Sequence, residues 1–190
     1  MKERPILFSG AMVRAILRGR KTQTRRICKK PIWTDMEDVP NHCTRYGNVA
    51  LPVKCPYGEP GDRLWVKETF AVNSQPAVYS YRADWVDGVK HVNKCIHSIF
   101  CTRKASRITL EIVAVRVERL QYITGQDAIA EGIHRFDLDG CEYFHWRKEA
   151  PTEEHFNSAV MAYRDLWRSI NGPDSWDANP WVWVVEFKRL

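Results

Sequence analysis

The feature that most constrains the fold is residues 107–120, the longest stretch of alternating apolar and polar side chains in the sequence. Ile108, Leu110 and Ile112 are apolar and the residues between them are polar, which is the pattern of a strand with one buried face. The alternation breaks at 113–115, where the one extra residue of a β-bulge would restore it. We therefore predict a long strand with a bulge near its middle.

Further strands are predicted on both sides of this stretch. Short runs of apolar, β-branched and aromatic residues predict them at 5–8, 63–70, 78–85 and 180–187. Asp87-Gly88 is a turn signal, and it predicts a hairpin that leads into a strand at 89–92.

Three segments have helical spacing. The first helix begins after Ser9, a residue that caps helices well, and stops at Gly19. A short second helix follows Thr124, which forms a capping box with Asp127, and ends at Gly132. A long third helix is predicted to begin at Thr152 and to end at 171–173, with an apolar stripe made of Phe156, Ala159, Val160, Tyr163, Leu166, Trp167 and Ile170.

Residues 28–61 lack periodicity and are rich in proline, glycine, asparagine and aspartate, so we predict an insertion loop there. No repeat or linker divides the chain, and we expect a single domain over 1–190. The order of the elements, with several strands between the first helix and the last two, predicts an α+β fold. We expect a mostly antiparallel sheet or barrel flanked by helices.

The segment most informative about function is 19–26, Gly-Arg-Lys-Thr-Gln-Thr-Arg-Arg. Lys21 and Thr24 are three residues apart, so a compact turn would direct an amine and a hydroxyl to one point. Arg20, Arg25 and Arg26 add three positive charges around them. The segment predicts an anion-binding and nucleophilic site. The alternative is the solvated end of a helix, where cations are favoured by the helix dipole.

The composition limits the partners that the protein could have. A net charge of +6, with Lys and Arg clustered along the chain, favours polyanions such as nucleic acid, although such a charge also serves solubility alone. No apolar run approaches the ~20 residues of a membrane span, and the N-terminus lacks the apolar segment of a secretory signal. We expect a cytoplasmic protein with no membrane partner.

The six cysteines have no CxxC spacing, and without a secretory signal we expect reduced thiols. Cys95, His97 and Cys101 form the densest group of potential metal ligands. Zinc sites usually pair their ligands two to four residues apart, and the remaining candidates, Cys28, His42, Cys43 and Cys55, are scattered upstream, so we expect neither a metal nor a cofactor.

Several landmarks together resemble the ASCH family of the PUA-like superfamily, and in particular its phage and prophage members. They are spread along the chain at 4–9, 19–26, 61–69, 106–111, 130–132 and 181–187. The resemblance implies a PUA-like β-barrel with a basic cleft that binds RNA, a modified nucleoside or DNA. The regions 28–58 and 133–175 exceed the minimal family core and are elaborations of it.

The resemblance also implies catalytic residues. Some small members look like amidohydrolases that remove the acetyl group of N4-acetylcytidine with a lysine and a threonine of a Lys-Thr-x-Thr motif and a later glutamate. Here these positions are Lys21, Thr24 and Glu131. Thr24 would be the nucleophile and Lys21 its base, if burial or arginine charge lowers the pKa of the amine. A charged Glu131 would raise that pKa, so the two demands conflict.

Two other functions remain open from sequence. The chain could be a ribonuclease acting on single-stranded RNA, with His134 and His145 as acid–base candidates. It could also be a non-catalytic RNA- or DNA-binding module whose arginines contact phosphates and whose aromatic residues stack on bases. The aromatic candidates are Trp65, Tyr79, Tyr81, Trp85 and Trp176. The complete predicted ligand-binding set is Arg20, Arg25, Arg26, Trp65, Glu68 and Arg107.

Overall fold

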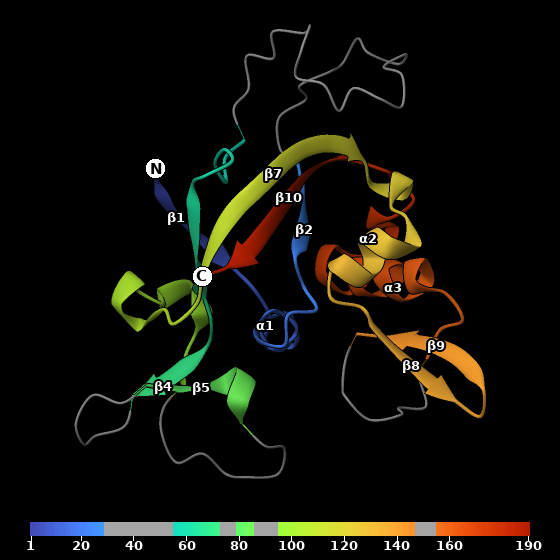
Figure 1. Ribbon diagram of the computed structural model, residues 1–190, viewed down its shortest axis with the longest axis horizontal. Helices are drawn as coiled ribbons and strands as arrows, with labels where there is room; N and C mark the ends of the chain where they lie inside the picture. Colours follow the sequence, from blue (N-terminus) through green and yellow to red (C-terminus); the bar gives the residue numbers. More distant parts are fainter. Residues whose placement is uncertain (29–54, 73–78, 86–94, 147–154) are drawn as a thin grey trace, which may run out of the picture.

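The long alternating stretch forms strand β7, Thr109–Arg119, at the centre of a five-stranded sheet (Figure 1). The computed structural model describes residues 1–28, 55–72, 79–85, 95–146 and 155–190. The sheet has the order β1-β3-β7-β10-β2. Its other strands are β1 (Glu3–Leu7), β2 (Gln23–Ile27), β3 (Arg63–Lys67) and β10 (Trp181–Arg189).

Three of the four strand pairings in this sheet are antiparallel, and only β1 pairs with β3 in parallel. The α+β class and the mostly antiparallel sheet are therefore confirmed. Within the described residues the sheet is open, because no ladder joins its edge strands β1 and β2. The side chain of Arg26 on β2 nevertheless reaches the end of β1, where its Nη2 donates to the Leu7 carbonyl at 2.7 Å.

The predicted bulge lies in β7. Glu186 of β10 faces Ala114, whereas the next residue, Phe187, faces Ile112. Val113 is thus left without a cross-strand partner, and 52% of its surface is exposed. The extra residue keeps Ile112 and Leu110 facing the core, where both are buried.

The first two helices begin and end as the sequence predicts. The Ser9 hydroxyl caps α1 (Gly10–Leu17), and Gly19 follows it with φ at +73°. Thr124 and Asp127 form the predicted capping box of α2, Gly125–Ala130. In Figure 1, α2 and α3 lie together at one side of the sheet, beyond β2 and β10. No helix of the described part is long and apolar enough to cross a membrane.

The third helix, α3 (Ala159–Asn171), begins later than predicted. The first predicted residue, Thr152, lies outside the described residues, and 155–158 are not helical. The reason is long-range pairing, because Phe156 and Phe144 exchange two backbone hydrogen bonds of 2.9 Å and thereby hold this segment extended. The predicted end is correct, since Gly172 follows the helix with φ at +100°. Ile170 belongs to the predicted apolar stripe but is 60% exposed.

Two of the predicted strands are shorter than expected. The strand predicted at 63–70 is interrupted after Lys67, and Phe70 begins β4 in a second sheet of order β5-β4-β6. The strand predicted at 78–85 is reduced to β5 and turns into a 3₁₀ helix, η1. The bounds are β4 Phe70–Val72, β5 Tyr79–Tyr81, η1 Arg82–Asp84 and β6 Cys95–Ile96.

The remaining predictions of loops and turns fall largely outside the described part. The strand at 89–92 and most of the insertion at 28–61 lie among residues that the structure does not describe. The remaining 3₁₀ helices are η2 Ser98–Phe100, η3 Arg103–Ala105, η4 Leu120–Tyr122 and η5 Pro173–Ser175.

A hairpin that the sequence interpretation missed follows α2. Strands β8 (His134–Leu138) and β9 (Cys141–His145) pair around a turn at Asp139-Gly140, where φ is +53° and +77°. Asp-Gly is the signal that predicts such a turn, and here it lies within a region that the resemblance marks only as an elaboration. The hairpin continues directly from the end of α2, and this places His134 three residues after Glu131.

Candidate functional site

Lys21 and Glu131 meet in the interior of the protein, although 110 residues separate them. Lys21 lies just before β2, and Glu131 caps the C-terminus of α2. The Lys21 Nζ donates to Glu131 Oε2 at 2.8 Å, to the Glu131 carbonyl at 2.8 Å and to the Gln23 carbonyl at 2.7 Å. Only 2% and 4% of the two side chains are exposed, so the pair is shielded from solvent.

Gly132 allows this close approach. A Cβ at this position would lie 3.0 Å from the Cβ of Ala15 and 3.3 Å from the Cβ of Lys21, and the backbone has φ at +101°. Both the conformation and the contact distance exclude a larger residue at low energy. The backbone also joins the two segments, because the Thr22 N–H donates to the Ala130 carbonyl at 2.9 Å.

Arg25 holds the other oxygen of the Glu131 carboxylate. Its Nη1 donates to Glu131 Oε1 at 3.2 Å, and its Nε and Nη2 bind Glu118. Asp127 lies 3.5 Å from Nη2. The Arg25 side chain is fully buried. We predicted that Arg25 binds a ligand, but in this structure its guanidinium is occupied by three carboxylates and fixes Glu131 in place.

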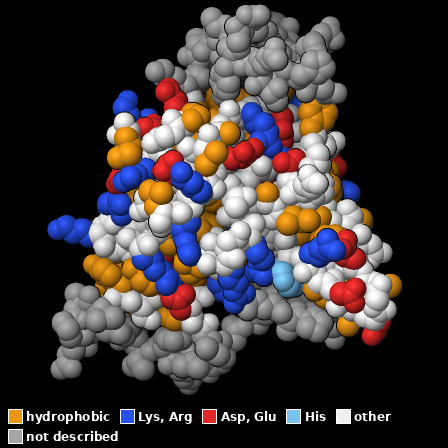
Figure 2. All heavy atoms as spheres, in the orientation of Figure 1, with side chains coloured by type: hydrophobic (Ala, Val, Ile, Leu, Met, Phe, Trp, Pro, Cys, Tyr) orange, Lys and Arg blue, Asp and Glu red, His pale blue; other side chains and the backbone are white. Residues whose placement is uncertain are grey.

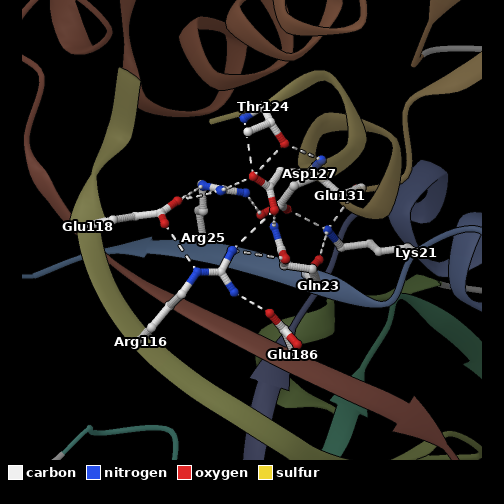
Figure 3. Close-up of polar contacts among 9 residues, drawn as sticks. All are labelled: Lys21, Gln23, Arg25, Arg116, Glu118, Thr124, Asp127, Glu131 and Glu186. Carbon is white, nitrogen blue, oxygen red and sulfur yellow. Dashed lines mark hydrogen bonds and ion pairs between the residues drawn. The ribbon is translucent and has the colours of Figure 1, made fainter. Parts of the chain in front are cut away.

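These groups belong to a larger polar network between the sheet and α2 (Figure 3). Arg116 on β7 binds Glu118, Asp127 and Glu186. Sequence reasoning missed these residues, because charged positions on an alternating strand resemble a solvated face. The signal was nevertheless present, since Arg116 and Glu118 share one face of the long strand. The nine residues of the network are Lys21, Gln23, Arg25, Arg116, Glu118, Thr124, Asp127, Glu131 and Glu186.

The electrostatics of Lys21 bear on its use as a base. Burial lowers the pKa of Lys21, and the charges of Arg26 and Arg25 act in the same direction, while the Glu131 carboxylate opposes them. Since Arg25 shares that carboxylate, Lys21 receives only part of its compensating charge. The net direction is a lowered pKa, so the effect of burial outweighs that of the Glu131 carboxylate.

Thr24 is buried on β2, opposite Val185 of β10. Alternate residues of a strand face opposite sides, so Thr24 points away from Arg25 and shares its face with Arg26. The Phe8 ring lies 5.2 Å from the Arg26 guanidinium carbon and 5.5 Å from the Lys21 Nζ. Among the described residues no hydrogen bond joins the Thr24 hydroxyl to Lys21 or Glu131, so the structure brings two of the three predicted catalytic residues into direct contact.

Arg20 and Arg26 differ from Arg25 in being only partly buried. The Nε atom of each is buried, and no described group hydrogen-bonds to it. Burial, together with the charge of Arg18, lowers the pKa of Arg20. Within the described part of the chain, these two arginines are therefore the members of the motif that are not held by carboxylates.

Arg107 and Glu68 form a separate cluster. Arg107 binds both Glu68 oxygens at 2.9 and 3.0 Å and both Asp84 oxygens at 2.6 and 3.0 Å, and its Cζ lies 4.0 Å from the centre of the Tyr81 ring. The buried contact of Glu68 coincides with the interruption of the predicted strand. The structure does not connect this cluster with Lys21 through any described contact.

The aromatic candidates for base stacking have mostly structural contacts. Trp176 is 7% exposed and packs against Tyr163 in the core, so it is not available for stacking. Tyr79 and Tyr81 pack on Phe70. Of the others, Trp65 is partly buried with Lys67 Nζ 5.8 Å from its ring, and the indole N–H of Trp85 donates to Ser80 at 2.8 Å.

His134 and His145 face each other across the β8–β9 hairpin, with the Nδ1 of His134 2.9 Å from the Nε2 of His145. The described residues contain no group of three potential metal ligands, and Cys95, His97 and Cys101 do not form one. The described cysteines are free thiols. Comparison of the chain with family models, with curated proteins and with solved structures found no match.

Proposed function

We propose that this protein is an ASCH-type, PUA-like amidohydrolase that removes the acyl group from an N4-acylated cytidine. The observation that carries the proposal is the buried contact between Lys21 and Glu131. The sequence resemblance points to these two residues independently of their contact, and they are in hydrogen-bond distance of each other across 110 residues of sequence. The lowered pKa of Lys21, caused mainly by burial, is what a general base requires.

In the proposed reaction, Lys21 first passes one proton to Glu131 Oε2, to which it already donates at 2.8 Å. The Thr24 hydroxyl then attacks the acyl carbon, and its proton moves to the neutral Lys21 amine. As the tetrahedral intermediate collapses, the bond between the acyl carbon and N4 breaks and the leaving amine takes the proton held by Glu131. Water then hydrolyses the acyl-threonine ester, which releases the carboxylic acid and restores Thr24.

The test is turnover of N4-acetylcytidine by the pure protein, followed by chromatography of cytidine. Thr24→Val is the sharpest variant, because it removes one hydroxyl without changing the charge of the network. We expect Thr24→Val to abolish turnover while leaving the unfolding midpoint close to wild type, and Thr24→Ser to retain part of the activity. Thr22→Val is the matched control, since Thr22 is an exposed threonine two residues away. The proposal is wrong if the wild-type protein deacetylates neither N4-acetylcytidine nor N4-acetylcytidine 5′-monophosphate.

A second candidate function is binding of RNA without turnover. It is favoured by a specific observation, namely that three acceptors already occupy the Lys21 ammonium, which is the arrangement of a structural ion pair. The net charge of +6 also suits a polyanion. Strongly salt-dependent RNA binding, equal in wild type and Thr24→Val and accompanied by no hydrolysis, would favour this function over the first.

A further inference from the structure

A pair of histidines lies beside the basic motif and takes no part in the chemistry proposed above. His134 on β8 and His145 on β9 are joined by a ring nitrogen contact of 2.9 Å, and Phe136 packs edge-on against His145 with centroids 5.2 Å apart. His145 is only 4% exposed, whereas His134 is partly accessible. The pair therefore has one buried and one accessible member.

The pair and its surroundings contain polar atoms that lack partners. The Nδ1 of His145 and the Nε of Arg20 are both buried, and no described residue hydrogen-bonds to either. Buried polar atoms in folded proteins are nearly always paired, so each of these two atoms indicates a missing partner. An anion with several acceptor oxygens offers an acceptor to the Arg20 guanidinium and, when the proton of His145 lies on Nδ1, to that nitrogen.

The charges around the pair are positive. Burial lowers the pKa of His134 and of His145, and the charge of Arg20 lowers both further. Arg18 acts on His134 in the same way. The other titratable groups at this end are His155 and Tyr143, whose rings contact each other, and Asp165 on α3, which accepts from the Trp146 indole. The region around the two histidines is therefore electropositive and would attract an anion.

We infer that Arg20, His134 and His145 form a binding site for a phosphate group, and that the substrate is therefore a nucleotide or RNA rather than a free nucleoside. The inference rests on the proposed function for the position of the base. Arg20 is adjacent to Lys21, and His134 lies three residues beyond Glu131. The same two segments thus present the reaction centre and the phosphate site side by side. Figure 2 shows Lys and Arg side chains gathered next to a histidine on this face.

Direct binding tests this site independently of turnover. Long-range ¹H–¹⁵N NMR spectra report the protonation and tautomer of each histidine ring while inorganic phosphate, cytidine 5′-monophosphate or a short cytidine-containing RNA is added. Each phosphate-containing ligand, but not cytidine, should shift the ring nitrogen resonances of the pair and hold a proton on the Nδ1 of His145, while one proton remains shared between the Nδ1 of His134 and the Nε2 of His145. Stronger effects of the monophosphate and RNA than of inorganic phosphate would assign the site to a nucleotide, and equal effects would assign it to free phosphate.

Arg20→Gln and His134→Gln are the test variants, because both side chains are partly accessible and tolerate exchange better than His145. Each should weaken binding of the monophosphate about tenfold or more, as expected for loss of a charge-assisted hydrogen bond. Arg135→Gln is the control, since Arg135 lies on the same hairpin and its side chain is 65% exposed. Unshifted histidine resonances with all three ligands, or equal binding by Arg20→Gln and Arg135→Gln, would overturn the inference even if the protein hydrolyses N4-acetylcytidine.

If turnover is detected, its kinetics give a second readout. Arg20→Gln should raise KM for N4-acetylcytidine 5′-monophosphate about tenfold more than it raises KM for N4-acetylcytidine, and the control Arg135→Gln should change neither KM. A fall in kcat for both substrates would instead mean that Arg20 acts on the reaction centre, and the phosphate site would be rejected. If no turnover is detected, the proposed hydrolase function fails, whereas the NMR titration still decides the phosphate site.

Discussion

The buried pair of Lys21 and Glu131 should respond unequally to loss of its two members. Glu131→Gln removes the carboxylate that pairs with Lys21, whose side chain is 2% exposed. No other described carboxylate lies within ion-pair distance of Lys21. Lys21 would keep two carbonyl acceptors, but its charge would be uncompensated. Breaking a buried pair in this way costs about 3–5 kcal/mol of unfolding free energy.

Lys21→Met should cost less. Glu131 would keep Arg25, whose Nη1 lies 3.2 Å from Oε1, so the carboxylate would remain compensated. The methionine is close to lysine in length and fills the space of its apolar stem. The loss comprises one hydrogen bond between charged groups, worth about 1.5–3 kcal/mol, and the two donations from Nζ to the carbonyls of Gln23 and Glu131, which add to it. The expected order is Glu131→Gln more destabilising than Lys21→Met, because only the first change leaves a buried charge without a counterion.

Urea unfolding followed by the fluorescence of the eight tryptophans measures these costs. The double variant should be less destabilised than the sum of the two single variants by about 2 kcal/mol, because each single change leaves a group without its partner. Arg135 and Glu142 form an exposed ion pair on the hairpin, with side chains 65% and 45% exposed, and provide the control cycle. Their coupling should stay below about 1 kcal/mol. Equal costs for the two single variants, or additivity within about 0.5 kcal/mol, would refute the reasoning.

Three further predictions concern the surroundings of the site. Gly132→Ala should destabilise the protein by about 2–4 kcal/mol, because the new Cβ combines positive-φ strain with contacts at 3.0 and 3.3 Å to the Cβ atoms of Ala15 and Lys21. Gly19→Ala, where φ is +73° and the surrounding space is open, should cost only about 1 kcal/mol. The midpoints of urea unfolding compare the two variants. Because the pKa values of His134 and His145 are lowered by burial and by neighbouring positive charge, the unfolded chain binds more protons than the folded chain just below the ordinary value of 6.5. Unfolding free energy should thus fall as the pH drops from 6.5 toward the lowered values, and a His134→Gln, His145→Gln double variant should flatten this profile in thermal unfolding across pH. Arg107→Lys should lower the unfolding free energy by about 1–3 kcal/mol, because an ammonium cannot bind both oxygens of the buried Glu68 and still reach Asp84. Thermal or urea unfolding measures this loss. A loss no larger than that of the control exchange Lys188→Arg, at an exposed ion pair, would contradict this role of Arg107.

Local rules predicted those elements whose ends are set by neighbouring residues. The caps at Ser9 and Thr124 depend on side chains three residues from their backbone partners, and both are present in the structure. The bulge at Val113 also follows from the alternation of one strand. Contacts between distant residues overrode local rules elsewhere. Phe156 pairs with Phe144 and delays the third helix, and the bond of Glu68 to Arg107 coincides with the break in the predicted strand.

The candidate site was predicted in part, and through resemblance more than through physics. Sequence spacing placed Lys21 in a basic motif but gave no reason to pair it with Glu131. The positions of Glu118 and Asp127 show why, because a carboxylate on a strand and one in a capping box are ordinary surface features until packing of α2 against β2 buries Arg25 between them. From its charge alone, Arg25 was predicted to bind a ligand, whereas its burial and its bond to Glu131 indicate that it holds this carboxylate in place.

The same packing also explains why the proposed reaction centre and the proposed phosphate site lie together. Residues 20 and 21 leave α1 as one short segment, and residues 131–134 leave α2 as another. Gly132 lets them approach within van der Waals distance, and the bond from Thr22 to Ala130 holds them there. Once Lys21 is bound to Glu131, Arg20 is brought to the start of the β8–β9 hairpin. Under the proposed function, a nucleotide that reached Lys21 from this side would meet Arg20 and His134, and a phosphate is the nucleotide group that their charge and donors fit.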